Sequence, residues 1–458
     1  MPLILPGNVG SATAATGFDV ANSCRFDDGS SAYMHKTPGG AGNRQKFTFS
    51  CWVKKTSGGT EELLSVGGST YTRIGFEGGD EIKIFHVASG STAWEIQTVA
   101  KYRDPSAWYN FVFAFDTTQG TASNRIKLYV NGVRVEPSSG FGDETYPSQN
   151  YTTEVNNAVK HRVGIANNDS SAPFDGYMSE VVLIDGQQLA PTEFGEFNED
   201  SGIWKPIDVS GLTFGTNGFY LDFEDSSALG NDVAGSNNFT VNNLTAIDQS
   251  TDTCTNNFAT LNPLTKSSAT FSEGNLKQGG AGASAVATFG VSSGKWYFEQ
   301  KILGGNNEAH LGFALEGSGI FSDNVTGSTV RGAGYVSLYS YDGKIYNEGS
   351  ATASFGTFAA NNIIGFALDV DNGNVYLYQN GSVLNSGNAV VSGKTGKTWF
   401  PFANFDAGDV TGIEHNFGGT QSFAISSGNT DGDGYGNFEY AVPSGYYALN
   451  TKNLAEYG

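Results

Sequence analysis

Two Asn-Gly turns, each between short alternating segments, constrain the fold of this chain more than any other feature. They occur in "NRIKLYVNGVRV" (residues 124–135) and "GNVYLYQNGSVL" (residues 373–384). A two-residue turn between antiparallel strands needs positive φ at both central positions, which Asn and Gly tolerate. Each segment therefore predicts a β-hairpin, and the repetition predicts two domains of one architectural type.

The composition favours short strands joined by tight turns. The 458 residues include 62 Gly, 32 Phe and 21 Tyr, and no long window shows a clear 3.6-residue period. Low-complexity disorder is the alternative for such a glycine content, but disordered chains are normally poor in aromatic residues. The length suits two or three domains with cores of their own. We therefore expect an all-β protein.

Charge and cysteine content exclude several classes of function. With 25 Lys and Arg against 46 Asp and Glu, the net charge of −21 opposes binding to nucleic acid and to anionic membranes. It suits a soluble, exposed component of a particle or a protein that binds divalent cations. The three cysteines imply no disulfide framework, and we expect Cys24, Cys51 and Cys254 to be buried free thiols.

The pattern of the first residues is neither that of a secretory signal nor that of a membrane-spanning segment. The start "MPLILPGNVGSATAATGFDV" has an apolar run of only a few residues, and no Lys or Arg precedes Arg25. We expect residues 1–20 to be an arm or attachment segment, and we expect no membrane insertion.

Residues 21–203 read as strand after strand, separated by clusters of Gly, Asn, Ser and Asp. Alternation is clear in "FTFSCWVKK", "AWYNFVFAFD" and "FDGYMSEVVLID". This block resembles the laminin-G or concanavalin-like jelly roll, which shows a "V-N-G" hairpin followed by an "F-x-G-x-I-D-E-V" strand and a turn with Leu and Glu. The matching residues are Phe174, Gly176, Met178, Glu180, Val181, Leu189 and Glu193. The family's Asp before the Glu is Ser179 here, so a cation role for that position does not carry over.

The second block, residues 267–458, resembles a SPRY domain. The matching motifs are "GKWYFE" (294–299), "GFALDVDNGNVYLYQNG" (365–381) and "FPFANF" (400–405). The resemblance implies a second concanavalin-like sandwich with a closing C-terminal segment. Between the blocks, residues 204–266 are rich in Asn, Asp, Ser and Thr but carry many aromatic anchors, so we expect an extended connector laid over both domains.

No motif of the sequence predicts catalysis. Some concanavalin-like folds are glucanases, which need two carboxylates about 5–9.5 Å apart, and the E-x-D-x-E strand of that chemistry is absent. The nearest candidate is Asp222 with Glu224 in "LDFED", and a solvated strand end explains it as well. We predict no catalytic residues.

One loop resembles a calcium site. In "NTDGDGYGN", Asn429, Asp431, Asp433, Tyr435 and Asn437 stand at alternate positions with Gly434 in the turn. This follows the D-x-(D/N)-x-(D/N)-G pattern, in which oxygen ligands converge on one hard cation. Tyr440 replaces the expected Glu at position 12, so a glycine-rich surface loop is the alternative. Calcium is the only cofactor that the sequence suggests.

Among the aromatic residues, three are predicted as glycan contacts. Trp52, Trp108, Trp296 and Trp399 lie on predicted strands, where they are expected to fill the core. Trp94 in "GSTAWEIQ" and the pair Tyr339 and Tyr341 in "SLYSYDG" are the better candidates for contact at the surface.

Over nearly its whole length the chain also resembles a group of virion proteins from marine tailed bacteriophages. The shared segments are the "MPLILP" start, residues 22–33, "FSCWVK", residues 252–263 and residues 443–454. The resemblance implies a non-catalytic structural protein of the virion, made in the host cytoplasm and released by lysis. The leading hypothesis is a tail-fibre or receptor-binding component that contacts a host surface glycan and other virion proteins, as a homo-oligomer. A capsid-decorating or tail-stabilising protein that binds only virion proteins is the alternative, and a polysaccharide depolymerase is the third hypothesis.

Overall fold

A computed structural model describes residues 17–280, 282, 284–304, 308–319, 329–352, 354–405 and 411–458. The described chain divides into two compact units, an N-terminal unit that ends at Thr255 and a C-terminal unit over Asn256–Gly458. Most of the predicted N-terminal arm, residues 1–20, lies outside the described residues. Each unit is treated by itself below.

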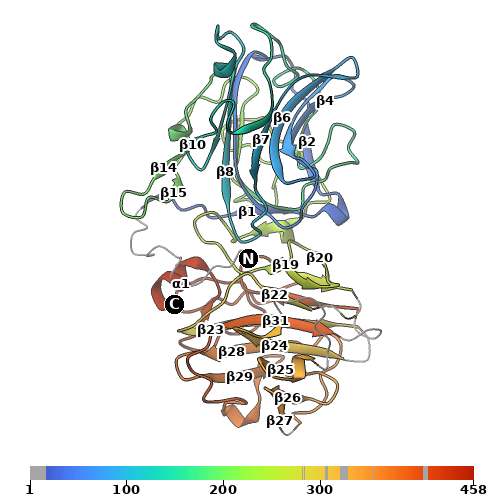
Figure 1. Ribbon diagram of the computed structural model, residues 1–458, viewed down its shortest axis with the longest axis vertical. Helices are drawn as coiled ribbons and strands as arrows, with labels where there is room; N and C mark the ends of the chain where they lie inside the picture. Colours follow the sequence, from blue (N-terminus) through green and yellow to red (C-terminus); the bar gives the residue numbers. More distant parts are fainter. Residues whose placement is uncertain are drawn as a thin grey trace. The chain divides into compact units, whose positions relative to one another are not determined.

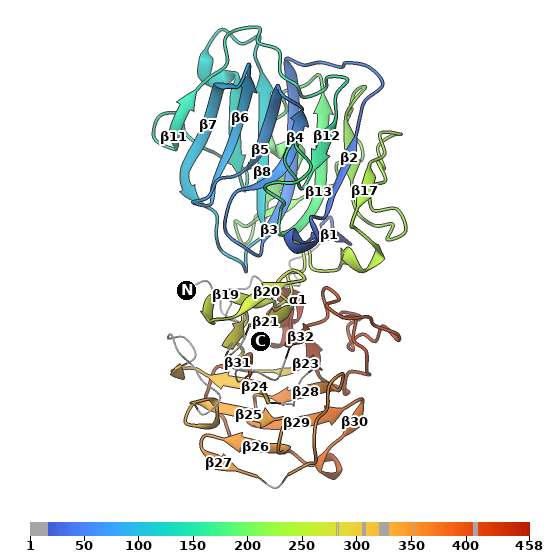
Figure 2. The same ribbon diagram turned by 90° about the vertical axis from the view of Figure 1, so that its right-hand side faces the viewer.

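The N-terminal unit is a sandwich of two antiparallel sheets of eight strands each. The first sheet contains, in spatial order, β10 (Val133–Arg134), β9 (Ile126–Val130), β8 (Tyr109–Asp116), β3 (Lys46–Lys55), β13 (Gly176–Asp185), β1 (Ser23–Phe26) and β18 (Gln249–Ser250), with β16 (Phe219–Leu221) also paired to β13. The second contains β11 (Phe141–Thr145), β7 (Ser91–Lys101), β6 (Glu81–Ala88), β5 (Tyr71–Phe76), β4 (Glu61–Gly67), β12 (His161–Val163), β2 (Tyr33–Lys36) and β17 (Thr240–Asn242). Figure 2 shows β7, β6, β5, β4, β12 and β2 side by side across this second sheet.

Apolar residues from alternate positions of both sheets form the core between them. In β3, Phe47, Phe49, Cys51 and Val53 belong to this core. The opposite face of the same strand is buried as well, and Trp52 on that face is buried as the sequence predicts. A second apolar cluster covers this outer face, and its members come from strands and from the segment that follows β13: Val112, Val182, Ile184, Phe194, Val209, Phe214 and Tyr220.

The predicted connector, residues 204–266, is divided between the units. Residues up to Thr255 belong to the N-terminal unit, where β15 (Trp204–Pro206) pairs with β14 (Gly195–Phe197) and β16 pairs with β13. Phe219 and Phe239 pack into the central core, and Phe214 and Tyr220 pack on the outer face. The aromatic residues that mark this segment in the sequence therefore anchor it to a sheet.

The C-terminal unit is also a sandwich of two sheets. One sheet has the order β19 (Leu261–Ser267), β22 (Ser284–Ala287), β31 (Trp399–Phe405), β24 (Ala309–Leu315), β25 (Tyr335–Tyr339), β26 (Lys344–Asn347) and β27 (Ser350–Ala351). The other has the order β20 (Thr270–Ser272), β21 (Lys277–Gly279), β32 (Gly412–Asn416), β23 (Lys295–Leu303), β28 (Ile363–Asp369), β29 (Asn374–Gln379) and β30 (Ser382–Val383), with β33 (Tyr447–Ala448) parallel to β23. Figure 1 shows β31, β24, β25, β26 and β27 in succession along the first of these sheets.

Both predicted hairpins are confirmed. Asn131 and Asn380 have φ of 46° and 48°, and the glycines that follow them have φ of 77° and 78°. These values at both central positions are those of the two-residue turn that matches strand twist. One hairpin joins β9 to β10 and the other joins β29 to β30.

The predicted fold class, two all-β antiparallel sandwiches, is confirmed. In the described part of the chain the only α-helix is α1 (Thr451–Tyr457), beside a few short 3-10 turns. No helix among the described residues is long and apolar enough to cross a membrane. In the tail, Phe417, Leu449 and Leu454 pack into the core of the C-terminal unit, as predicted for a closing segment.

Candidate functional site

The hairpin between β25 and β26 presents the most exposed aromatic ring of the predicted contact residues. Tyr341 lies in its turn and is 59% exposed. The amide of Gly343 donates to the carbonyl of Tyr339 at 2.9 Å, and the amide of Lys344 donates to the carboxylate of Asp342 at 3.0 Å. These bonds fix the turn that carries Tyr341.

The segment that follows β27 (residues 354–356) forms hydrogen bonds to the same turn. The amide of Phe355 donates to the carbonyl of Gly343 at 2.8 Å, and the Ser354 hydroxyl donates to the carbonyl of Asp342. Gly343 has φ of 65°, and a Cβ there would lie 1.7 Å from the Gly356 carbonyl oxygen. Only glycine permits this approach, so the sequence "YDG" encodes a rigid tip.

Tyr341 belongs to a cluster of rings with a cation and a carboxylate. Its ring centroid is 5.9 Å from that of Tyr339, which lies 6.3 Å from the ring of Tyr346. The Arg331 guanidinium carbon lies 4.8 Å from the Tyr339 ring centroid and 5.7 Å from that of Tyr346. The Tyr346 hydroxyl donates to Asp342 at 2.9 Å. The cluster therefore combines one exposed ring with charged groups of both signs.

A buried histidine supports the cluster from the sheet. His310 on β24 stacks on Tyr339 with ring centroids 4.4 Å apart and planes 4° from parallel. Burial, with Arg331 nearby, lowers the pKa of His310 to about 3. The imidazole is therefore neutral and packs against Tyr339 as an uncharged aromatic ring. The prediction of Tyr339 as a surface contact is wrong, because the residue is buried; its ring supports Tyr341 from below.

Such an arrangement is suited to contact with a sugar. A pyranose has an apolar C–H face that an exposed aromatic ring covers, and hydroxyl groups that arginine and carboxylate groups bind. No carboxylate pair with the roles of a glycosidase belongs to this cluster among the described residues, since Asp342 already accepts from Tyr346 and Lys344. The cluster is a candidate site for binding.

The prediction for Trp94 is wrong. This residue lies on β7 and is only 1% exposed, within the central core of the N-terminal unit. Its ring stacks on His86 at 5.7 Å and lies 5.5 Å from the ring of Phe115. Exposure was expected because Trp94, unlike the four tryptophans assigned to the core, does not stand in a segment that the sequence predicts as a strand.

The predicted calcium loop is built on one carboxylate that has four hydrogen-bond donors. Asp431 accepts from the amides of Asp433, Tyr435 and Ala448 and from the Asn453 side chain, at 2.8–3.0 Å. The remaining candidates also have partners: Asn429 donates to Phe438, and Asp433 accepts from Tyr457. Asn437 contributes its backbone carbonyl as an acceptor for Asn416. These bonds explain the order of the loop without a cation, and calcium binding there stays a prediction.

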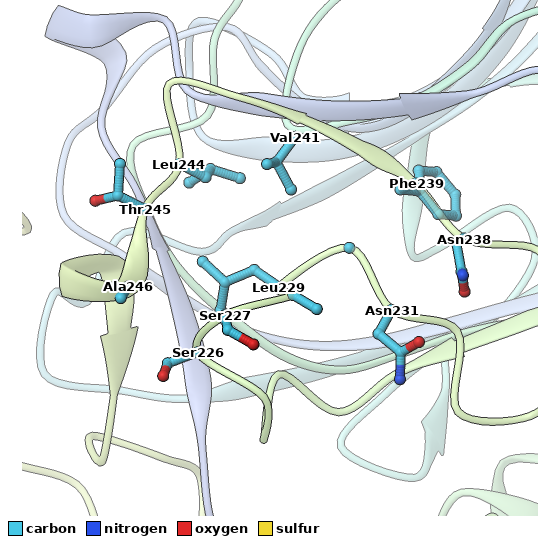
Figure 3. Close-up of a pocket in the computed structure, with 12 residues that line it drawn as sticks. Ser226, Ser227, Leu229, Asn231, Asn238, Phe239, Val241, Leu244, Thr245 and Ala246 are labelled. Carbon is cyan, nitrogen blue, oxygen red and sulfur yellow. The ribbon is translucent and has the colours of Figure 1, made fainter.

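A pocket of about 390 Å³ lies in the N-terminal unit between residues 226–231 and residues 238–246, two segments of the predicted connector. Figure 3 shows Leu229, Val241 and Leu244 facing the space between these segments, with Ser226 and Asn231 nearer its edges. The sequence did not point to this pocket. Its centre is apolar, polar side chains such as Ser226 and Asn231 lie at its edges, and no charged residue lines it.

A strained buried glutamate is the other feature that sequence reasoning missed. Glu180 has φ of 51° at a bulge of β13, where the strand changes its partner from β1 to β16. The Tyr220 hydroxyl donates to its carboxylate at 2.7 Å. Burial raises the pKa of Glu180 to about 8, and Asp222 and Glu224 add to this effect. The negative charges of Asp222 and Glu224 in "LDFED" therefore contribute to the raised pKa of Glu180.

The comparisons with known proteins agree with the architecture of the N-terminal unit. A family model described as the Concanavalin A-like lectin/glucanases superfamily matches residues 28–193. The resemblance of this block to laminin-G and concanavalin-like domains is thereby confirmed. No curated protein matches the chain.

Several solved structures are similar to parts of the chain, all at low identity. The SPRY domain of human HERC1 is 15% identical with a TM-score of 0.30, and the match covers 36% of this chain and 99% of that domain. A proposed carbohydrate-binding protein from Bacteroides ovatus is 17% identical with a TM-score of 0.33, and the match covers 50% of this chain and 60% of that one. A heptameric SAP-like pentraxin from Limulus polyphemus is 12% identical with a TM-score of 0.28, over 38% of this chain and 80% of that one.

Proposed function

We propose that this protein binds a glycan without cleaving it, through the hairpin tip that carries Tyr341. The observation that supports this most is a ring 59% exposed on a turn held by hydrogen bonds on both sides. A rigid aromatic anchor loses little conformational entropy on binding, so its buried area contributes to affinity.

The setting of this site supports a role on the outside of a particle. The acidic composition and the resemblance to virion proteins of marine tailed bacteriophages favour a tail-fibre or receptor-binding component. Its glycan would then be a host surface polysaccharide, and its other partners would be virion proteins, including further copies of itself. The superfamily matched by residues 28–193 contains lectins by its description, which agrees with a binding role.

A second candidate function, assembly with other virion proteins alone, is favoured by an exposed apolar pair. Phe197 and Ile203 are 49% and 54% exposed on the hairpin formed by β14 and β15. Their backbones are joined, since the Asn198 amide donates to the Ile203 carbonyl at 2.8 Å. Exposed apolar side chains on one hairpin suit contact with a protein.

One set of experiments separates these functions. The purified protein is applied to an array of bacterial surface polysaccharides, and reducing-sugar release is measured on every polysaccharide that it binds. Binding without release supports the proposal. Binding to none, together with labelling of the assembled particle by antibodies to the protein, favours the assembly role. Sugar release identifies a depolymerase and contradicts the proposal.

A further inference from the structure

Three carboxylates from distant parts of the sequence meet at one end of the first sheet of the N-terminal unit. Oxygen atoms of Asp27, Asp28 and Asp175 all lie within 4.8 Å of one another. None of these residues belongs to the loop that the sequence suggested as a calcium site. The cluster lies outside the hairpin tip that we propose for glycan binding.

The register of the sheet brings the three together. Strand β1 pairs with β13 so that Phe26 lies opposite Gly176, and the next residue on each strand is Asp27 and Asp175. Asp28 begins the 3-10 turn that Asp27 caps, because the Asp27 carboxylate accepts from the Ser30 amide at 2.9 Å. Like charges directly opposite on paired strands are destabilising unless something compensates for them.

Asp175 supplies an independent indication of a ligand. Its side chain is only 5% exposed, and its Oδ1 atom has no hydrogen-bond partner among the described residues. A buried carboxylate oxygen without a donor is costly, because it has lost water, and the Thr56 and Ser57 side chains beside the carboxylate offset only part of this cost. Burial and the charges of Asp28 and Asp27 raise the pKa of Asp175 to about 7.

We propose that Asp27, Asp28 and Asp175 form a binding site for a hard divalent cation of the size of Ca²⁺. Such ions take carboxylate oxygens at about 2.3–2.6 Å, so two ligands on opposite sides of one ion lie about 4.6–5.2 Å apart. Oxygen atoms within 4.8 Å of one another fit around a single ion of this size. The smaller Mg²⁺ demands near-ideal octahedral geometry and usually keeps several waters, so a group of three protein carboxylates suits Ca²⁺ better.

The charged residues beside the three aspartates leave the cluster available to a cation. Glu61 lies near enough to interact with Asp175 through charge, but burial raises the pKa of Glu61 to about 8, so this group is largely protonated at neutral pH. Lys55, the cation beside Glu61, is held by that residue at 3.6 Å and by Asp80 at 2.8 Å. The ion would join the turn after β1 to the start of β13 and so stabilise the pairing of those two strands.

The test measures calcium binding to the full chain after treatment with EDTA, by calorimetry and by the shift of the thermal unfolding midpoint with added CaCl₂. Asp28→Asn is the first variant, because Asp28 is exposed and its replacement leaves the fold unstressed. Asp175→Asn is the second, with folding checked by circular dichroism. We expect each to weaken Ca²⁺ binding by about tenfold or more, because affinity follows the number of charged ligands.

Two controls make the outcome specific. Asp200→Asn removes one exposed charge from the N-terminal unit and should keep wild-type affinity. Asp433→Asn alters the other candidate calcium loop and should leave unchanged the binding step that Asp28→Asn weakens. The proposal is overturned if the wild-type chain binds no Ca²⁺ at millimolar concentration. It is also overturned if Asp28→Asn binds as tightly as wild type, or if only Asp433→Asn loses binding.

Discussion

The Nζ atom of Lys54 lies 2.7 Å from Oδ2 of Asp252, and each side chain is at most 1% exposed. The two residues are far apart in sequence, one in the middle of the first sheet and one near the end of the N-terminal unit. Asp252 also accepts from the Trp108 indole at 3.1 Å, and its carbonyl accepts from Ser23 at 2.6 Å. This ion pair therefore links the last residues of the N-terminal unit to β3.

Replacing Asp252 by Asn should destabilise the N-terminal unit by about 3 kcal/mol. The substitution leaves the Lys54 charge buried without its counter-charge, which costs more than the intact pair contributes. Chemical denaturation followed by tryptophan fluorescence measures the change. A double variant, Lys54→Met with Asp252→Leu, should recover part of the loss, because it buries no charge but removes the acceptor of the Trp108 indole.

The exposed pair of Lys205 and Glu196 gives the matched comparison. These side chains lie 3.0 Å apart but are 25% and 57% exposed. Glu196→Gln should change stability by less than about 1 kcal/mol, because solvent screens the pair. An equal loss in both single variants would show that burial of the Lys54 pair is not what matters.

The strands and hairpins could be predicted from the sequence because their signals are local. Alternation in "FTFSCWVKK" and the Asn-Gly turns depend only on neighbouring residues, and both are found as β3 and as the tips of the two hairpins. Alternation does not reveal that a later segment covers the outer face of β3. Trp94 does not stand in a segment that the sequence predicts as a strand, yet it lies on β7 and is buried.

The candidate sites were less predictable because they depend on register. Nothing in the sequence places Asp27 near Asp175; the pairing of β1 with β13 does so. The strain at Glu180 likewise follows from a bulge at which β13 changes partners. Tyr341 was predicted correctly as an exposed aromatic residue, since "YDG" marks a turn on local grounds alone.

Replacing Tyr341 by Ala should weaken glycan binding by about tenfold or more, because the ring is the main exposed apolar surface of the hairpin tip. Thermal stability should stay close to wild type, since the ring is outside the core. Phe197→Ala, which removes an exposed ring from the N-terminal unit, is the control and should bind as wild type does. Equal loss in both variants would argue against a site at the hairpin tip.

Replacing Glu180 by Gln should raise stability at pH 8 and leave it nearly unchanged at pH 4. The folded pKa of about 8 lies above the unfolded value of about 4.5, so the folded state binds the additional proton between these values. Stability from this group is present below pH 4.5 and is lost as the pH rises toward 8. Because Gln has no such proton, the variant should gain about 2 kcal/mol or more over wild type across this window.

The comparison of Glu180→Gln with wild type isolates one group among several. Tyr220, Asp222, Glu224 and Asp208 all face or influence this carboxylate, and they are the same in both proteins. Urea denaturation at intervals from pH 4 to pH 8 provides the measurement. A stability difference that does not vary with pH would show that Glu180 is ionised in the folded protein.

Calcium binding at Asp27, Asp28 and Asp175 should weaken as the pH falls below about 7. A cation binds the ionised carboxylate, and the pKa of Asp175 in the absence of the ion is about 7, so protons compete with the metal below that pH. Loss of one ligand to one proton reduces apparent affinity by about tenfold for each pH unit below the pKa. Calorimetric titration with CaCl₂ at pH 8, 7, 6 and 5.5 measures this decline in calcium affinity. Asp28 and Asp27 carry charges that face Asp175, so Asp28→Asn should move the onset of the decline to lower pH by removing one repelling charge. Glu61, with Lys55 beside it, has a pKa of about 8 and is largely protonated over most of this range. An affinity that is constant from pH 8 to pH 5.5 would place the ion on groups that are already ionised, and so away from Asp175.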